Sequence, residues 1–587
     1  MLLLVLAGLI PLLITPGILF HYDITPKIIA LVFAAAIALM RPAAVADGVA
    51  ALWNRRSGRW LCGVAAAQTV WLAVCTAAST RPWFSFLGAG WRRMGLLTML
   101  AMIVCIVLVA ASVCLKGEFT KTFLRATAVA AAIASLYGIA QYFDIDPLQP
   151  ASAYQAHAGD SVIVRPPGTL GHADYFGWWL AVALFCAAAL TGRWRWVGRA
   201  SALLCGIAIL LSGTRSAMLG VLAGFVVLLF LRGVKFGARM AVAWALLIAL
   251  LAGFYFSPAG VRMRARVQWS ASEPLGGARP LLWRDSIRMI AERPLTGFGP
   301  ETFGAEFPRY QSTDLARLLP NFYQESPHNT AIDALVSEGI PGFALATLWL
   351  ALGGCAAWSA RKEYPALGAA LAASAVTAMF SAVTCGPLLA TGLVIAVLSA
   401  VAPEDRRPRL RIRTGAILAA SVPVSLCFVA YGAMLMVSDF TLARFQSDTG
   451  PESWRLVTHT AMPGAGEDLY GSRRLSEVCG KEPACFGLAL EAANRATRSA
   501  DSPSNAWYNL AILTAARNEP APVEAALRKA AALAPNWFKP HWALASLLAI
   551  TDRRPEALAE ADRALFLDRS QDAEVVQTAA RLRGVSH

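Results

Sequence analysis

Charged residues are scarce in this chain. They make up 15% of its 587 residues, whereas hydrophobic residues make up 57%. A domain that folds in water carries more polar surface than this composition supplies, which excludes an ordinary soluble protein. Many of the hydrophobic residues fall in runs of about 20, the length that crosses the hydrocarbon core of a bilayer. The sequence therefore predicts a protein that lies in a lipid membrane.

The sequence also lacks the short motifs of many soluble enzymes. It holds no Walker phosphate-binding loop, no HExxH pair and no CxxC pair. These motifs are common sequence signs of a bound nucleotide or of a zinc ion held by histidine or cysteine. We therefore expect no cofactor and no metal site.

Apolar segments predict an all-α fold, a polytopic bundle of about 12 to 13 transmembrane helices. The segments lie at residues 2–20, 28–46, 61–79, 95–115, 123–142, 173–191, 196–212, 215–232, 238–256, 330–358, 364–385, 387–402 and 414–437. The first segment lacks a basic start and an A-x-A cleavage site, so we expect a retained span and not a removed signal peptide. Residues 1–437 would form the membrane domain.

Basic residues alternate along the chain in a way that orients the bundle. Basic, acid-poor loops follow the even-numbered spans, near residues 41–59, 116–125, 193–199, 232–239, 361–362 and 406–413. The positive-inside rule places such loops in the cytoplasm. The large loop 257–329 and the chain after about residue 438 would then lie outside it. Much of the net charge of +15 follows from this topology, so no nucleic-acid partner is needed to explain it.

The hydrophobic runs stop after residue 438, and a different pattern begins. Within residues 487–587 the sequence repeats with a period of 34, so that Leu510 and Ala511 match Leu544 and Ala545. This period is typical of tetratricopeptide repeats, in which helix pairs stack into an α-solenoid. Residues 438–486 would connect the two regions. The tail is either a surface that docks a protein or a glycan, or a cap that stabilises the fold.

Two of the eleven cysteines, Cys479 and Cys485, lie in this tail. An oxidising compartment would allow them to form a disulfide, and two free thiols are the alternative. The other nine lie in or close to the predicted spans, where they would pack as apolar side chains.

Most polar residues of interest on the predicted outer face are cations. The candidates for a site are Arg92, Arg93, Arg165, His172, Arg215, Arg279, Arg284, Arg288 and His328. An arginine inside a span costs about 3 kcal/mol on insertion scales, so it is rarely kept without a partner or a task. A set of cations at a membrane surface indicates chemistry on an anionic, lipid-borne substrate.

Arg215 and His328 are the sharpest candidates, and each has an ordinary alternative. Arg215 follows small residues in LLSGTRSAMLG, where it either binds phosphate through paired hydrogen bonds or anchors a helix end at the bilayer surface. His328 begins the helix after the large loop; it is either a base or a capping and packing residue. The amphipathic helix near 280–292 is either an interfacial anchor or a lid that lowers a cation onto a lipid headgroup.

Six motifs, taken in order, resemble the bacterial O-antigen ligase and polymerase superfamily. They are RPWFSFLGAGWRRMGLL, YGIAQYFDIDPL, RPPGTLGHADYFGWWLA, LLSGTRSAMLG, ARPLLWRDSIRMIAERPLTGFGPETF and SPHNTAIDALVSEGIPG, and they span about residues 80–345. The resemblance implies a C-type membrane glycosyltransferase fold. It also implies transfer of a glycan from an undecaprenyl-diphosphate carrier to an acceptor, at the periplasmic face of the bacterial inner membrane.

The same resemblance assigns roles to individual residues. Arg215 matches the family arginine after a small-residue turn, Arg279 the arginine of an R-x-x-x-W helix, and His328 the histidine of an H-N motif. The arginines would hold the diphosphate and stabilise its departure, and His328 would deprotonate or position the acceptor hydroxyl. The anomeric carbon would be inverted without a metal. The secondary candidates for substrate contact are Arg165, His172, Arg92, Arg93, Arg284 and Arg288.

The acceptor stays open at this point. Lipid A-core would make the protein a ligase, the growing glycan a polymerase, and a serine or threonine of a pilin or other protein an oligosaccharyltransferase. The site motifs do not separate these three, because the donor is common to all of them. We take the ligase first on the breadth of the resemblance. A transporter of lipid-linked glycan, from a different class, would show inverted repeats with polar groups at mid-membrane. A scaffold would tolerate replacement of Arg215 and His328.

Overall fold

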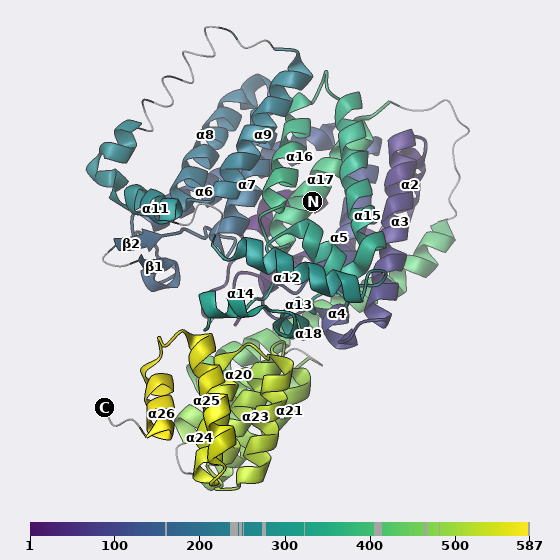
Figure 1. Ribbon diagram of the computed structural model, residues 1–587. Coiled ribbons are helices and arrows are strands. Elements are labelled where there is room, and N and C mark those ends of the chain that lie inside the picture. The colour runs from purple at the N-terminus through teal and green to yellow at the C-terminus, as the bar shows by residue number, and fades with distance from the viewer. Residues whose placement is uncertain are drawn as a thin grey trace.

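The computed structural model of the chain describes residues 1–587 except 159–160, 235–236, 238–244, 246–248, 250–251, 273–276, 322, 404–413, 463–465, 480–481 and 585–587. Across the described residues it consists of helices and one two-stranded hairpin. The helices form a bundle, a layer of short helices covers one end of it, and a helical tail packs on that layer (Figure 1). The predicted all-α class is confirmed.

Seven described helices are long and apolar enough to cross a membrane, or eight if one bent pair counts as a span. They are α3 (Arg56–Ala77), α5 (Leu96–Leu115), α6 (Glu118–Tyr142), α8 (Arg195–Ser212), α9 (Arg215–Arg232), α15 (Thr330–Ser359) and α18 (Thr414–Ser447). Three shorter apolar helices complete the bundle: α7 (Ala173–Ala188), α16 (Pro365–Ala378) and α17 (Cys385–Val401). These ten helices match ten of the predicted segments, as expected for a polytopic membrane protein.

The prediction of one long helix over residues 2–20 is wrong. A π-helical turn, η1 (Leu4–Leu9), leads directly into a 3-10 turn, η2 (Ile10–Leu12), and the helix ends there. Pro11 has no N–H to donate, which weakens regular helix at this point. Hydropathy alone did not reveal this, because the whole segment is apolar.

The prediction of one continuous helix over residues 28–46 is also wrong. The segment divides into α1 (Thr25–Leu39) and α2 (Pro42–Trp53), which are bent by 91°. Proline disfavours helical backbone in the residue before it, so the chain turns ahead of Pro42 and a new helix begins there. The predicted span 238–256 and the basic loop 406–413 lie largely or wholly outside the described residues.

α7 lies at the centre of the bundle, with nearly all of its residues buried among α6, α8, α9, α16 and α17. Small residues allow its closest approach to α9. A Cβ at Gly177 of α7 would stand 2.9 Å from the side chain of Thr214, and one at Gly224 of α9 would stand 2.3 Å from the ring of Phe185. Close packing of small residues stabilises helix pairs where lipid removes the usual hydrophobic gain. The first turns of α7 and α9 are therefore held together.

The large loop is fixed to α15 where that helix is interrupted. Gly339 has a φ of 70° and divides the first turns of α15 from the rest. A Cβ there would stand 2.0 Å from the carbonyl oxygen of Leu295, so only glycine fits. Nearby, the N–H of Phe298 donates to the carbonyl of Val336 at 2.8 Å. The loop is thus attached to the segment of α15 that follows His328.

Short elements cover this end of the bundle (Figure 1). They are α4 (Pro82–Leu87), β1 (Gln155–Ala158), β2 (Ser161–Val164), α11 (Val261–Ser272), α12 (Arg279–Glu292), α13 (Phe303–Glu306) and α14 (Thr313–Leu318). The strands β1 and β2 pair antiparallel. α12 agrees with the helix predicted near 280–292, whereas no sequence signal pointed to the hairpin.

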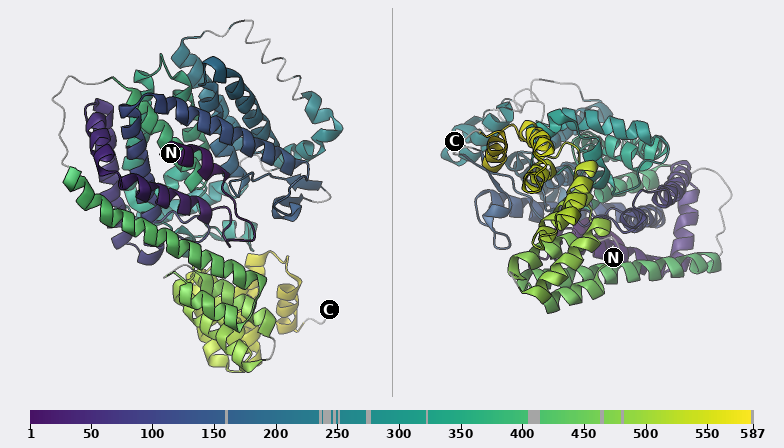
Figure 2. Two further views of the ribbon diagram at one scale, coloured as in Figure 1. Left: turned by 180° about the vertical axis from the view of Figure 1, so that it is seen from behind. Right: turned by 60° about the horizontal axis from the view of Figure 1, so that its bottom comes forward.

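The helix α18 runs beyond its predicted end at 437 and leads from the bundle into the tail (Figure 2). The tail consists of α19 (Pro451–Thr460), α20 (Glu467–Cys479), α21 (Pro483–Ser499), α22 (Pro503–Ala515), α23 (Pro520–Leu533), α24 (Phe538–Ile550), α25 (Arg554–Asp568) and α26 (Ala573–Arg583). Ala511 and Ala545, which the 34-residue period equates, are both fully buried. The assignment to tetratricopeptide repeats and the division at residues 438–486 stay predictions.

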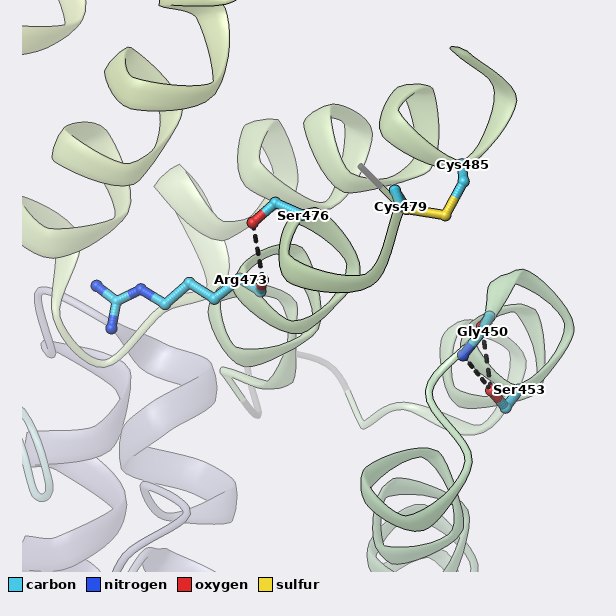
Figure 3. Close-up of a disulfide and its surroundings, with 6 residues drawn as sticks. All are labelled: Gly450, Ser453, Arg473, Ser476, Cys479 and Cys485. Carbon is cyan, nitrogen blue, oxygen red and sulfur yellow. Dashed lines mark hydrogen bonds between the residues drawn. A yellow bond between two sulfur atoms is a disulfide. The ribbon is translucent and has the colours of Figure 1, made fainter. Parts of the chain in front are cut away.

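A disulfide joins Cys479 of α20 to Cys485 of α21 (Figure 3). Of the two alternatives for this pair, the structure shows the bonded one. The remaining nine cysteines are free thiols. Disulfides form mainly in oxidising compartments, which agrees with an outer location for the tail.

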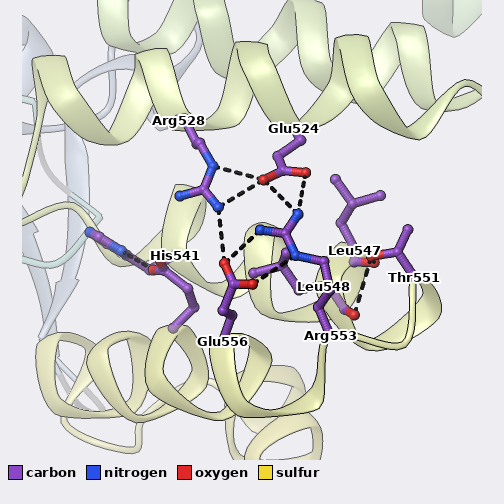
Figure 4. A network of polar contacts seen from close by, with 9 residues as sticks. Glu524, Arg528, His541, Leu547, Leu548, Thr551, Arg553 and Glu556 are labelled. Atoms are coloured by element: carbon purple, nitrogen blue, oxygen red, sulfur yellow. Dashed lines mark hydrogen bonds and ion pairs between the residues drawn. The ribbon is translucent and has the colours of Figure 1, made fainter.

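Ion pairs on the tail surface link α23 to α25 (Figure 4). Arg553 binds Glu524 at 2.8 Å and Glu556 at 2.6 Å, and Arg528 binds Glu524 at 2.7 Å. Exposed pairs of this kind contribute at most about 1 kcal/mol each. The tail therefore depends mainly on its buried alanine and leucine contacts.

Candidate active site

Four helix starts meet at the covered end of the bundle. Arg215 begins α9, Arg279 begins α12, His172 caps α7, and His328 comes two residues before α15. Together with Arg165 and Asp174 these residues form a group that we call the helix-start cluster. Helix N-termini carry partial positive charge, so the backbone adds to the positive field of the arginines.

Direct contacts bring these segments together. The hydroxyl of Thr214 donates to the carbonyl of Ala173 at 3.0 Å, which holds the start of α9 against the start of α7. Arg279 lies 3.6 Å from the carboxylate of Asp174, which joins α12 to α7. Trp283 of α12 donates through its indole N–H to the carbonyl of Pro327 at 2.9 Å. The residue after Pro327 is His328, so α12 positions both Arg279 and the histidine segment.

The turn that presents Arg215 depends on a glycine. Gly213 has a φ of 64° and ends α8, and after one extended residue Arg215 begins α9. Left-handed backbone of this kind is easily adopted by glycine alone. Among the small residues around Arg215, Thr214 contacts the backbone of α7, and a Cβ at Gly177 would stand 2.9 Å from its side chain.

Asp174 is the residue that the sequence analysis missed. Its carboxylate accepts from the guanidinium of Arg165 at 2.6 Å on one oxygen and lies near Arg279 on the other. The side chain is 9% exposed. The motif GHADYFG contains this aspartate two residues after the helix cap, but a search confined to cations passes over it. A lone acid among basic candidates was the available signal.

The helix-start cluster has more positive than negative charge. Arg165 and Arg279 share Asp174, which sets two positive charges against one negative charge, and Arg215 is close enough to act on the pKa of Arg279. Burial lowers the pKa of the Arg279 guanidinium, and the charges of Arg165 and Arg215 lower it further, against the opposing effect of Asp174. An anionic ligand would relieve this repulsion.

His328 is partly buried and has an unusual backbone conformation. Its φ is 49°, in the left-handed region that non-glycine residues rarely occupy, and such strain collects at functional sites. The cap of α15 is Asn329, whose side chain accepts from Ala331 and Ile332. His328 therefore does not serve as the side-chain cap. Burial, with the nearby charge of Arg279, lowers the pKa of His328 to about 4, so its imidazole is neutral at pH 7.

His172 has a defined capping contact. Its Nδ1 accepts from the backbone N–H of Asp174 at 3.2 Å, which leaves Nε2 to carry the proton of the neutral ring. Burial lowers the pKa of His172, and the charges of Arg165 and Arg279 act in the same direction, against that of Asp174. The side chain is 44% exposed and can reach a ligand in the cluster.

Arg92 and Arg93 do not join this cluster. Arg92 lies 2.8 Å from Asp333 and also forms an ion pair with Glu301, and its side chain is 3% exposed. Arg93 lies 3.0 Å from Asp439 and is 1% exposed. Their charges are already balanced by buried carboxylates, although Arg92 lines the apolar cavity described below, so their contact with the headgroup of a lipid carrier stays a prediction.

Arg284 and Arg288 lie on the exposed part of α12. Arg284 donates to Ser312 at 2.7 Å and to Asp314 at 3.3 Å, and Arg288 lies 4.0 Å from Asp285. Their side chains are 45% and 58% exposed. The structure therefore separates them from Arg279, although all three belong to one helix.

An apolar cavity of about 210 Å³ opens beside the start of α15. Thr330 and Asp333 line it near His328, and Met99, Met102 and Trp349 line it within the bundle. A cavity of this kind, lined by many apolar and several polar or charged side chains, suits a ligand that combines a charged head with a hydrocarbon chain. Among the described residues, no group of histidine, cysteine, aspartate or glutamate side chains is arranged to hold a metal ion.

Comparison with known proteins gives one family. Residues 200–347 match the family Wzy_C, described as O-antigen ligase. The match includes Arg215, Arg279 and His328, and it ends before the tail. No curated protein matches the chain. Residues 200–347 are therefore similar to the O-antigen ligase family, and this similarity, with the polytopic helical bundle, supports a membrane protein of the glycan ligase or polymerase kind.

Proposed function

We propose that this protein transfers a glycan from an undecaprenyl-diphosphate carrier to an acceptor at the periplasmic face of the inner membrane, as an O-antigen ligase does. The observation that carries the proposal is the helix-start cluster, in which Arg165 and Arg279 share the carboxylate of Asp174, and Arg215 and the neutral His328 lie near Arg279. The similarity of residues 200–347 to O-antigen ligases supports the same reaction class.

The donor would bind through its diphosphate. The guanidinium groups of Arg165, Arg215 and Arg279 match phosphate oxygens in geometry and charge, and Arg165 and Arg279 share only one carboxylate, which favours an anionic ligand. The first part of the lipid chain would enter the apolar cavity that begins at Thr330. This arrangement needs no metal, because the arginines supply the positive charge.

The chemistry would be a single displacement. The acceptor hydroxyl attacks the anomeric carbon from the face opposite the diphosphate, and the configuration at that carbon inverts. The bond from the anomeric carbon to the phosphate oxygen breaks, and its electron pair leaves with undecaprenyl diphosphate. The arginines stabilise the charge that develops on this leaving group. Neutral His328 accepts the proton of the hydroxyl.

The basic helix ends support the outer location of this chemistry. α8 runs from Arg195 to the turn before Arg215, and α3 runs from Arg56 to a segment that bonds to the large loop through Thr80 and Phe298. The basic ends of these helices therefore lie opposite the helix-start cluster. Basic loops favour the cytoplasm, so the cluster would face the periplasm.

The test is a transfer assay with purified protein and an undecaprenyl-diphosphate-linked glycan, in the presence of EDTA. Wild type is compared with Arg215→Ala, His328→Ala and the exposed control Arg284→Ala. Lipid A-core, glycan and protein acceptors are analysed separately, so that the labelled acceptor distinguishes ligase from polymerase and from oligosaccharyltransferase. Transfer that survives EDTA and is lost in the two cluster variants supports the proposal. Movement of donor across the membrane with no transfer to any acceptor would favour a transporter.

A further inference from the structure

A second, smaller pocket lies between the large loop and the tail. It measures about 110 Å³, room for only a few water molecules or one small ring. Its walls come from residues 307–324 of the loop and from residues 504–539 of the tail. Gln324, one of its lining residues, comes four residues before His328. The pocket therefore lies next to the segment that carries the candidate base.

Specific contacts hold the two walls together. The side chain of Asn536 donates to the carbonyl of Gln311 at 2.6 Å, and the hydroxyl of Tyr323 donates to the carbonyl of Asp501 at 2.8 Å. The guanidinium of Arg317 lies 4.4 Å from the centre of the Phe566 ring. The tail thus completes the pocket in a fixed position, and a ligand would meet a formed site.

Three side-chain amides of this pocket have no partner. Within the described part of the chain, Gln311, Asn321 and Gln324 make no hydrogen bond through their side chains, and Gln324 is only 5% exposed. Each amide offers one acceptor and two donors. Gln324 is a buried residue that lines the pocket, Gln311 is partly exposed and Asn321 is exposed, so water or a ligand in the pocket can complete the hydrogen bonds of these amides.

The rest of the lining narrows the class of ligand. Phe307 and Trp537 contribute aromatic surface. Among the lining residues that the structure describes, Lys539 is the one charged residue and none is a carboxylate. A phosphate site would need more than one cation. Unpaired amides beside aromatic rings instead match a neutral ring that carries many hydroxyl groups.

We propose that this pocket binds one sugar residue of a glycan substrate, so that the tail helps to hold the glycan beside the helix-start cluster. The proposal rests on the proposed function, because it assumes that the protein handles a glycan. Of the roles that the sequence predicted for the tail, it favours glycan docking, and it assigns that role to a defined pocket shared with the large loop.

Saturation-transfer NMR on the purified full chain tests this inference. The probe is the glycan released by mild acid from the lipid-linked pool of the native cells, without its carrier. We expect saturation of its ring protons by the wild type. Gln324→Leu and, separately, Gln311→Ala should weaken binding about tenfold, because each removes hydrogen bonds worth about 1.4 kcal/mol. Gln571→Leu, an exposed glutamine of the tail, is the matched control and should bind as the wild type does.

Two comparisons separate this inference from the proposed function. Arg279→Ala should lose transfer and keep binding of the free glycan. A wild type that transfers glycan but binds no free glycan overturns the sugar pocket and leaves the proposed function standing. Equal binding by the two pocket variants and the wild type also overturns it. So does a serine- and threonine-rich peptide that binds the wild type in place of the glycan and is lost in the pocket variants.

Discussion

Two groups of arginines lie at the same end of the bundle, and their surroundings differ. In the helix-start cluster, Arg165 and Arg279 share a single carboxylate, Asp174, and their side chains are each 28% exposed. Arg92 has two carboxylates of its own, and Arg93 has Asp439, with side chains at most 3% exposed. One group is accessible with charge in excess, whereas the other is buried and balanced.

This difference distinguishes arginines that can bind a ligand from arginines that stabilise the fold. A buried arginine that already has its carboxylates gains nothing from a phosphate, and removal of either partner leaves an unpaired charge in the interior. An accessible arginine that shares its carboxylate has hydrogen-bond donors to offer. The sequence alone does not distinguish the two groups, so experiments that compare one arginine from each group test the difference.

The largest effect is expected at His328. His328→Gln should lower transfer about 100-fold or more, because a positioned base contributes that much to proton transfer. With a pKa lowered to about 4, His328 stays in the neutral, accepting form, so kcat/KM of the wild type should be flat from about pH 6 to about pH 8. His459→Gln, on an exposed face of the tail, is the control. An acid limb near the ordinary histidine value of about 6.5 would contradict the assigned environment.

Arg92→Met should act on stability. It leaves Asp333 and Glu301 buried without their cation, a change that typically costs about 3 to 5 kcal/mol of the free energy of unfolding. We expect a melting temperature several degrees below that of the wild type in detergent, with Arg288→Met, an exposed arginine, unchanged. A variant that melts normally and loses only transfer would instead indicate that Arg92 contacts the substrate.

Arg279→Ala should show the opposite pattern. Loss of one donor to the leaving group is expected to lower kcat about 100-fold, close to 3 kcal/mol, with little change in melting temperature. Arg279→Lys should recover only part of this, because an ammonium group lacks the fork that binds two phosphate oxygens. Arg284→Ala on the same helix should transfer at the wild-type rate. If Arg279→Ala melts as early as Arg92→Met, the two groups of arginines do not differ as described.

The smallest effect is expected for Asp174→Asn. The change removes the negative charge that Arg165 and Arg279 share and weakens the 2.6 Å contact to Arg165. Donor should then bind more tightly, which lowers KM, while looser arginines lower kcat about tenfold, in line with one charge-assisted hydrogen bond. Steady-state kinetics at low salt measures both KM and kcat. A rise in KM would indicate that Asp174 contacts the substrate itself.

Much of the bundle was predictable from hydropathy, because a helix in lipid must consist of about 20 mostly apolar residues. The failures at residues 2–20 and 28–46 share a cause. Hydropathy reports where side chains will lie, and it does not report whether the backbone stays straight past Pro11 or Pro42. Hydropathy gave no indication of the β1–β2 hairpin.

The site was partly predictable. The resemblance and the cations identified Arg165, His172, Arg215, Arg279 and His328, which the fold brings to four helix starts. The sequence did not separate Arg92 and Arg93 from these residues. The carboxylates that bind Arg92 and Arg93 are 241 and 346 residues away in the chain. Asp174 was passed over for a simpler reason, since only cations were considered.

The sequence by itself determined the helical class, the membrane location and the chemical type of the candidate residues, because these depend on composition and on runs of neighbouring residues. Only the tertiary structure decided which arginines keep excess charge, which pair with buried carboxylates, and how the tail closes a pocket on the large loop. Charge balance and access depend on contacts between segments hundreds of residues apart, such as Arg93 with Asp439 and Tyr323 with Asp501. No local pattern in a single chain records those distances.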